Sequence, residues 1–339
     1  MQKSPFTIQT LDKSTSRNSI SFEDASVVFV SDFFTDEYSG GAELSTEALF
    51  ESAPFQVFKL KSQELTQDHI SKGAEKIWVF FNFASMNLNL IPIVVGNLYY
   101  YIVEYDYKFC RYRSIEKHAA ETGSDCDCHK QEYGMFVSAF FAGAEHIFWM
   151  SNAQKKIYEE RFNFISEKES SVLSSIFTVS DLEHIEKLRK SRDTKDISEK
   201  FVIMNSNSWI KGVEKTKDHL TSRKIDYEVV GGLVYHDMLE KLSKHKGLAF
   251  HPLGGDTCPR LVIEAKLLGL EIDVNENVQH STEDWWQKPL DEIESYLLDG
   301  HNRFWNKILE FLQKEPMISG YTTVKDVEDT IKKLEKLYK

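Results

Sequence analysis

The sequence has few cysteines and lacks a long, uninterrupted hydrophobic run. Its 339 residues include only 4 cysteines, too few for a disulfide framework, so reduced thiols are expected. The longest apolar stretch, residues 88–103, is broken by polar residues, proline and glycine, and it is shorter than the roughly 20 apolar residues of a membrane helix. The first residues, MQKSPFTIQTLDKSTSR, lack the apolar core and cleavage site of a secretory signal. We therefore expect a cytoplasmic protein without a transmembrane segment.

Positive charge is also scarce. Forty-one Lys+Arg residues against 53 Asp+Glu residues leave a net charge of -12, and this field repels polyphosphate chains, so nucleic acid is not an expected partner. Two short basic runs, residues 187–192 and 332–336, are expected on solvated helix faces, and they leave peripheral membrane contact open. An anionic ligand would need a local pocket.

Several common catalytic signatures are absent as well. The sequence contains no GxxxxGK[ST] phosphate loop, no GxGxxG dinucleotide fingerprint and no GxSxG nucleophile elbow. These absences remove support for P-loop, nicotinamide and serine-hydrolase chemistry.

Strand-like runs alternate with helical patterns in both halves of the chain, which indicates parallel sheets covered on both faces. A segment rich in Ser, Lys, Glu and Asp, residues 166–200, separates the halves. We expect an α/β protein with two Rossmann-like domains whose parallel sheets face a central cleft. The predicted strands lie at 25–34, 76–83, 99–105 and 144–150, then at 201–208, 227–232 and 247–253; the predicted domains are 1–185 and 186–312, followed by a helical segment at 313–339.

The segment HPLGGDTCPRLVIEAKLLG (251–269) is the most informative in the sequence. A predicted strand ends in a Gly-Gly turn, Asp256 follows, and Glu264 lies about one and a half turns into the next predicted helix. Ligands bind at this edge of a doubly wound sheet, and a helix start suits an anion such as a diphosphate. Read from their spacing alone, the two acids fit better as a helix cap and a solvated side chain than as a binding site.

The spacing Asp256-x7-Glu264-Ala265 resembles the nucleotide-sugar signature of glycosyltransferase family 4, the group 1 glycosyltransferases, with Asp where that family usually has Glu. Three other segments resemble family motifs in the same order, although each alone could be an ordinary turn or a solvated charge. They are SGGAELSTEAL (39–49), NSNSWIKG (205–212) and YEVVGGLVYHDMLEKL (227–242).

This resemblance implies a GT-B fold and a hexosyltransferase-type enzyme that uses a nucleotide-diphosphate sugar, with retention of anomeric configuration and no dedicated protein base. The first domain would face an unknown glycan, lipid or small-molecule acceptor, and the second would hold the donor. A segment near the chain end, 289–312 or 324–339, would cross back onto the first domain. The implied donor residues are Lys211, Gly40, Gly41, Thr257 and Cys258 at the diphosphate, Asp256 at the sugar, Glu264 at the ribose, and Gly232 and Leu233 at the base; Asp106 and His129 are the acceptor-side candidates.

One cation of the family pattern is missing. The family commonly has an arginine about five residues before the clamp lysine, where this chain reads Asn205, Ser206 and Asn207. Arg260, helix amides or a divalent cation are the candidate replacements, and no other cofactor is expected. Two further hypotheses therefore stay open: a GT-B sugar-nucleotide epimerase, and a non-catalytic protein that binds nucleotide sugars.

The loop EYDYKFCRYRSIEKHAAETGSDCDCHKQEYG (104–134) belongs to no recognised motif. It holds soft ligands of the kinds that zinc uses, Cys110, Cys126, Cys128 and His129, with His118 nearby. The spacing matches no common zinc module, so no metal is the main expectation. A zinc site, a disulfide involving Cys110 and unligated thiols all remain open.

Overall fold

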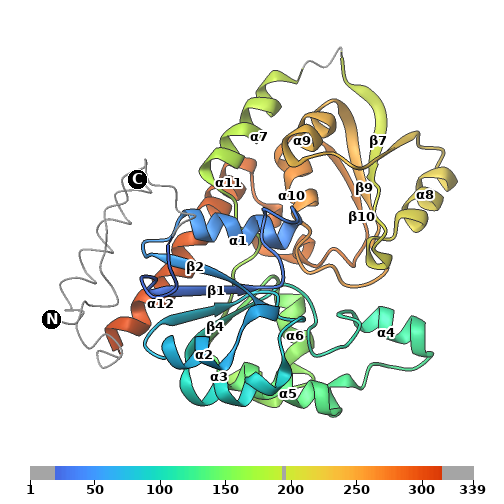
Figure 1. Cartoon of the computed structure of the whole chain (residues 1–339). Helices are drawn as coiled ribbons and strands as arrows, with labels where there is room; N and C mark the ends of the chain where they lie inside the picture. The colour runs from blue at the N-terminus through green and yellow to red at the C-terminus, as the bar shows by residue number, and fades with distance from the viewer. Residues whose placement is uncertain (1–19, 193–195, 315–339) are drawn as a thin grey trace.

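The computed structural model describes residues 20–192 and 196–314. In this part of the chain, a six-stranded sheet has the order β2-β1-β3-β4-β5-β6 and a four-stranded sheet has the order β10-β9-β7-β8 (Figure 1). All neighbouring strands are parallel. The strands are β1 (Val27–Ser31), β2 (Val57–Lys61), β3 (Ile77–Phe80), β4 (Tyr99–Glu104), β5 (His146–Trp149), β6 (Ser170–Val172), β7 (Ser198–Met204), β8 (Tyr227–Val230), β9 (His245–Phe250) and β10 (Glu271–Val274).

Helices cover both faces of each sheet (Figure 1). In the first lobe, α2, α3, α5 and α6 cover one face and α1 and α12 the other. In the second lobe, α7, α9, α10 and α11 cover one face and α8 the other. The helices are α1 (Gly41–Glu51), α2 (Gln67–Lys72), α3 (Ile91–Asn97), α4 (Ile115–Thr122), α5 (Glu132–Gly143), α6 (Asn152–Glu159), α7 (Val179–Ser191), α8 (Val213–Ser222), α9 (Tyr235–Ser243), α10 (Arg260–Leu267), α11 (Leu290–Leu298) and α12 (Gly300–Lys314).

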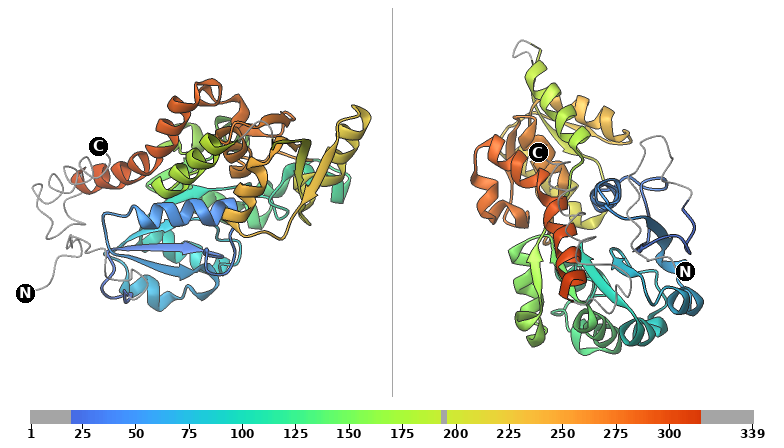
Figure 2. Two further views of the ribbon diagram at one scale, coloured as in Figure 1. Left: turned by 90° about the horizontal axis from the view of Figure 1, so that it is seen from above. Right: turned by 90° about the vertical axis from the view of Figure 1, so that its left-hand side faces the viewer.

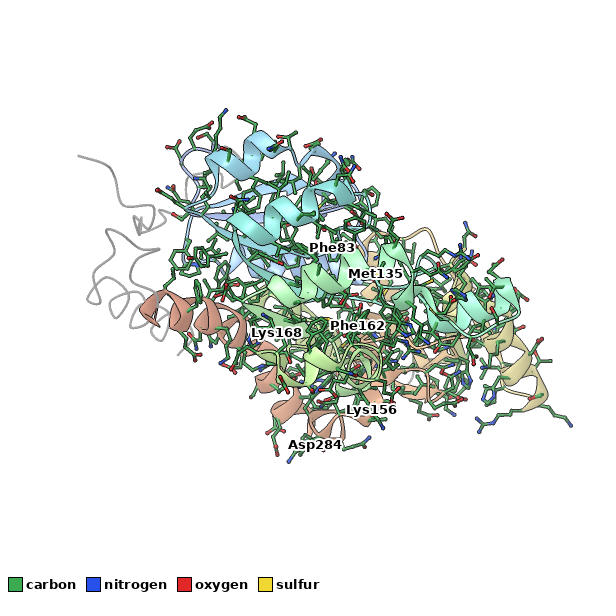
Figure 3. All side chains as sticks on the ribbon, turned by 90° about the horizontal axis from the view of Figure 1, so that it is seen from below. Phe83, Met135, Lys156, Phe162, Lys168 and Asp284 are labelled. Carbon is green, nitrogen blue, oxygen red and sulfur yellow. The ribbon has the colours of Figure 1, made fainter. Side chains whose placement is uncertain are left out.

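The four central strands of the first sheet, β1, β3, β4 and β5, are largely apolar because their side chains alternate between two buried faces. Val28 and Val30 of β1 join the core under α2, α3 and α5, whereas Val27 and Phe29 join the core under α1 and α12. The first of these cores extends to Phe83 and Phe162, which are labelled in Figure 3. No helix in the described ranges is both long enough and apolar enough to span a bilayer.

The described chain passes between the lobes twice, and the two crossings touch. The first crossing, residues 173–178, leads from β6 into α7, and the second leads from α11 into α12. A Cβ on Gly300 would collide with the Ile176 side chain, and the Arg303 guanidinium donates a hydrogen bond to the Leu173 carbonyl at 3.2 Å. The two connections between the lobes therefore lie side by side.

The second crossing returns the chain to the first lobe, where α12 lies beside α1 (Figure 2). The Trp305 ring stacks on Phe29 with centroids 5.9 Å apart, and its indole N–H donates to the Leu49 carbonyl at 3.3 Å. The segment that crosses back thus includes residues 300–312, and the expected helix at 324–339 lies outside the described residues.

The domain boundary differs in position from the prediction at 185/186. Ile185 lies within α7, and both Ile185 and Phe177 are buried in the second-lobe core. The polar composition of residues 166–200 reflects the solvated face of this helix, because α7 packs on α9, α10 and α11. The chain therefore leaves the first lobe before α7 begins.

The predicted fold class is confirmed in its α/β architecture: two lobes, each with a parallel sheet covered by helices, enclose a cavity between them. The seven predicted strands are all present, with ends shifted by a few residues. The sequence pattern did not predict β2, β6 or β10. These are three- to five-residue strands at sheet edges with partly exposed side chains, so they lack the apolar signal of a buried strand.

Candidate active site

A cavity of about 860 Å³ lies between the lobes, at the carboxyl ends of strands from both sheets. Strand order reverses between β1 and β3 in the first sheet and between β7 and β9 in the second, and such switch points open a crevice for ligands. Nine of the predicted site residues line the cavity: Gly41, Asp106, Lys211, Leu233, Asp256, Thr257, Cys258, Arg260 and Glu264. The other three, Gly40, Gly232 and His129, are not part of its wall.

Lys211 and Asp256 form an ion pair on the wall of this cavity. The Lys211 ammonium lies 2.7 Å from a carboxylate oxygen of Asp256, and the side chains are 37% and 12% exposed. Gly212 has a left-handed φ of +59°, and a Cβ there would collide with the His251 carbonyl. Glycine therefore allows the turn after β7 to pack against the end of β9, which brings the lysine beside the aspartate.

Arg260 and Glu264 form a second ion pair, which is buried in a network of hydrogen bonds. The Arg260 Nε donates to Glu264 Oε1 at 2.8 Å, and its Nη1 donates to the Ile176 carbonyl at 2.6 Å. Its Nη2 donates to Asp181 at 2.6 Å and to the Tyr235 hydroxyl at 3.0 Å. Both side chains are 2% exposed. Because its three guanidinium nitrogens are all engaged within the protein and its side chain is buried, Arg260 is poorly placed to bind a diphosphate in this arrangement.

Glu264 belongs to this network and also lines the cavity. Its Oε1 also accepts a hydrogen bond from the Tyr235 hydroxyl at 2.8 Å. Burial raises the pKa of Glu264, and the neighbouring Arg260 guanidinium opposes that rise. Arg260 and Tyr235 thus fix the orientation of a carboxylate that lines the cavity.

The start of α1 faces the start of α10 across the cavity wall. A Cβ on Gly41 would lie 3.3 Å from Arg260 Cβ, so the two helix starts are nearly in contact. A Cβ on Gly40 would lie 2.6 Å from a carboxylate oxygen of Glu43, which is itself buried. Burial raises the pKa of Glu43, while backbone N–H groups at Glu43 and Gly40 counter that rise by hydrogen bonding. The Glu43 carboxylate therefore lies at the amino-terminal end of its own helix, α1. The sequence motifs did not predict this contact.

The first-lobe wall centres on Asp106. The Arg113 Nε donates to Asp106 at 2.6 Å, and Arg113 Nη2 donates to the Asn82 side chain at 2.9 Å. The buried Lys108 ammonium lies 3.3 Å from the other carboxylate oxygen. Burial pushes the pKa of Asp106 upward, but Lys108 and Arg113 outweigh it and hold that pKa below the usual value. Asp106 is thus a charged anchor for two cations.

Arg113 and Asn82 line the cavity, and neither was predicted from the sequence. Arg113 has a φ of 55°, an uncommon backbone conformation for a non-glycine residue. Its side chain is 38% exposed, nearly the same as that of Lys211. Asn82 follows β3 at the first switch point, a position that could have signalled it; Arg113 lies in an irregular loop that gives no such signal.

His129 lies apart from the cavity, unlike Asp106. Its ring packs edge-on against Phe109 and Phe162, and its Nδ1 is buried with no hydrogen-bond partner in the described part of the chain. Burial lowers the pKa of this histidine. The cysteines expected near His129 instead meet His118, so the histidine of the candidate ligand set is corrected to His118.

No family model and no curated protein matches this chain. Among solved structures, Anabaena Alr3699/HepE in complex with UDP-glucose is 11% identical, with 92% of this chain and 99% of that chain covered and a TM-score of 0.46. An alpha-glucosyltransferase in complex with UDP and a 13-mer DNA is 9% identical, with 85% and 94% covered and a TM-score of 0.45. AviGT4, a glycosyltransferase involved in avilamycin A biosynthesis, is 10% identical, with 83% and 96% covered and a TM-score of 0.45. Because these scores are low, the function proposed below rests on the geometry of this chain.

Proposed function

We propose that the chain is a glycosyltransferase that transfers a sugar from a nucleoside diphosphate sugar to an acceptor, with retention of anomeric configuration. The observation that carries this proposal is the Lys211–Asp256 pair on the wall of a cavity at the carboxyl ends of two facing parallel sheets. An ammonium group there can stabilise the negative charge that develops on a departing diphosphate.

The donor lies against the second lobe in this proposal. Lys211 and the amides at Thr257 and Cys258, just before α10, bind the diphosphate, and Asp256 orients the sugar. Glu264 accepts hydrogen bonds from the ribose hydroxyls through the oxygen that does not serve Arg260 and Tyr235. Leu233, which is 43% exposed on the cavity wall, packs against the base.

Arg113 supplies the second positive charge that the family pattern places before the clamp lysine. It reaches the same cavity from the first lobe, held by Asp106 and Asn82. The assignment of Arg260 to that role is less suitable, because its guanidinium nitrogens are already engaged. Asp106 then has a positioning role on the acceptor side.

The reaction breaks the bond between the anomeric carbon and the diphosphate oxygen and forms a bond from the acceptor hydroxyl to the same face. The leaving phosphate oxygen takes the proton of the acceptor hydroxyl, so no side chain is needed as a base. Water must be kept out, because an open donor would be hydrolysed.

The proposal is tested with the full chain and a panel of UDP-, GDP- and ADP-sugars. A donor that binds the folded protein raises the melting temperature with concentration, and release of nucleoside diphosphate is then followed with and without candidate glycan, lipid and small-molecule acceptors. We expect stabilisation by one donor class and acceptor-dependent release. Stabilisation by no donor would refute the nucleotide-sugar site, conversion of the donor alone would indicate an epimerase, and binding without turnover would favour a non-catalytic protein.

A further inference from the structure

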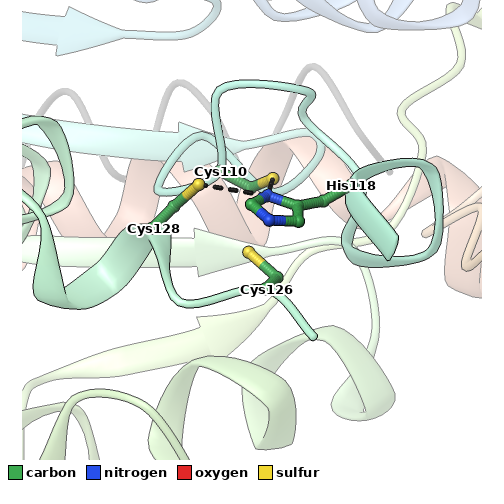
Figure 4. A group of neighbouring side chains, drawn as sticks. All are labelled: Cys110, His118, Cys126 and Cys128. Atoms are coloured by element: carbon green, nitrogen blue, oxygen red, sulfur yellow. Dashed lines mark hydrogen bonds between the residues drawn. The ribbon is translucent and has the colours of Figure 1, made fainter. Parts of the chain in front are cut away.

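Three cysteines and one histidine converge in the loop between β4 and α5, outside the cavity wall (Figure 4). Cys110 lies before α4, His118 within α4, and Cys126 and Cys128 after it. Figure 4 shows the three sulfurs around the His118 imidazole. All four residues are buried, although they are distributed over residues 110–128, a segment that includes α4.

The spacing of the four ligand atoms suits a tetrahedral zinc ion. All of them lie within 4.8 Å of one another, and His118 Nδ1 lies 3.3 Å from Cys128 Sγ and 3.8 Å from Cys110 Sγ. A tetrahedron with Zn–S of about 2.3 Å and Zn–N of about 2.0–2.1 Å has N···S edges of about 3.6 Å and S···S edges of about 3.8 Å. The observed N···S distances lie on either side of the expected edge.

A disulfide within this cluster would engage fewer of these atoms than a metal ion would. It would use two of the sulfurs and leave the third thiol and the imidazole beside it, whereas a zinc ion uses all four groups. A second group of potential ligands, His219, His251 and Asp273, is less suited to a metal. There the Arg223 guanidinium donates to Asp273 at 2.9 Å and already neutralises its carboxylate.

We propose that Cys110, His118, Cys126 and Cys128 bind a structural Zn²⁺ ion that holds the first-lobe wall of the cavity in place. Cys110 and His118 flank Arg113 and Lys117, which both line the cavity. With all four positions filled by protein ligands, the ion has no open site for catalysis. This proposal stands independently of the transfer reaction.

The first measurement is the metal content of the full-length protein purified without chelators. We expect one equivalent of zinc per chain in the wild type, and loss of that zinc in the His118→Ala and Cys128→Ser variants. His129→Gln is the matched control, because His129 neighbours the cluster in sequence and lies outside it in the structure; this variant keeps its zinc. A wild-type protein without zinc, or equal zinc in the His118→Ala variant, would overturn the proposal.

Two measurements on the wild-type chain avoid dependence on variants that fold poorly. Replacement of zinc by Co²⁺ is expected to give the strong visible bands of a tetrahedral thiolate site, and octahedral Co²⁺ bands would contradict the ligand set. Chelation is expected to speed hydrogen exchange in residues 105–131 and to leave β7–β10 unchanged, while the three cysteines of the cluster become titratable. A count of two free thiols in the unfolded, unreduced protein would indicate a disulfide and reject the zinc site.

Discussion

The two walls of the cavity each present one partly exposed cation held by an aspartate. On the second lobe this pair is Lys211 and Asp256, and on the first it is Arg113 and Asp106. The pairs differ in how they are supported. Gly212 and the end of β9 position Lys211, whereas Arg113 stands in a long loop next to the cysteine and histidine cluster.

This difference explains why the cation of the second-lobe wall could be predicted from the sequence and the cation of the first-lobe wall could not. A short turn keeps its residues at the carboxyl end of the strand before it. Such residues can therefore be located as soon as the strand is predicted from the sequence. A long loop can follow many paths, and its contacts with segments distant in the sequence decide which side chain reaches the cavity. The second wall also contains a cation of another kind, Arg260, which is buried in a network and holds the structure together.

The largest expected effect separates the buried cation from the exposed one. Arg260→Ala leaves Glu264 and Asp181 buried without their partner, so the free energy of unfolding should fall by about 3–5 kcal/mol. Lys211→Ala breaks a more exposed pair and should cost about 1 kcal/mol or less. Urea unfolding of both variants measures the contrast. Equal losses would show that the two second-lobe cations have the same kind of role.

The next effect concerns turnover. If Lys211 stabilises the departing diphosphate, Lys211→Ala should lower kcat by about 10²–10³, the effect of losing one donor to a developing oxyanion. The control is Lys215→Ala, an exposed lysine of α8 that is not part of the cavity wall. Steady-state kinetics on the donor and acceptor found in the screen decide the matter. A twofold change in kcat for Lys211→Ala would remove this lysine from the mechanism.

A smaller effect is expected on the first wall. Arg113→Ala should weaken transfer by about 10- to 100-fold, because a hydrogen bond to a charged group contributes about 1.5–3 kcal/mol. Arg111→Ala is the matched control from the same loop, since Arg111 is exposed and does not line the cavity. The ratio of kcat/KM between the two variants is the informative quantity. Identical kcat/KM values for the two variants would show that Arg113 does not contribute to transfer, which would leave Lys211 as the single essential cation.

The smallest expected effect is a pH dependence of the free energy of unfolding. It comes from His280, in the core of the second lobe. His280 is fully buried, and burial lowers its pKa to about 3. Its contribution to stability is complete above the unfolded pKa of about 6.5 and declines as pH falls toward 3, because only the unfolded chain takes up the proton. By pH 5.5 the loss is about 1.4 kcal/mol.

The His280→Phe variant keeps an aromatic ring between Trp285 and Trp286 without a titrating nitrogen. Unfolding is measured at pH 7.5 and at pH 5.5 for both proteins. We expect the variant to gain about 1.4 kcal/mol on the wild type over this interval. A constant difference between the two proteins would mean that folding does not lower the pKa of His280.

Much of the fold could be predicted because buried parallel strands are apolar runs that alternate with amphipathic helices. The second-lobe residues could be proposed because Lys211, Asp256 and Glu264 follow recognisable strands and belong to motifs in a familiar order. Arg113, Asn82 and Glu43 were missed for a physical reason: their roles depend on contacts between segments distant in sequence or on a side chain folding back on its own helix. The exchange of His129 for His118 has the same origin, since α4 rather than sequence proximity brings the ligand to the cysteines.

The contact between the two crossings, Gly300 against Ile176, lies next to Ser175 of the cavity wall. The lobes are also joined away from this contact, because Ser151 donates to the Gln279 side chain at 3.1 Å and the Asn152 side chain donates to Glu283 at 2.7 Å. Ile176 also accepts a hydrogen bond from Arg260 at 2.6 Å. Arg260 also donates to Glu264, so a single guanidinium links the segment that connects the lobes to the carboxylate proposed to hold the ribose of the donor.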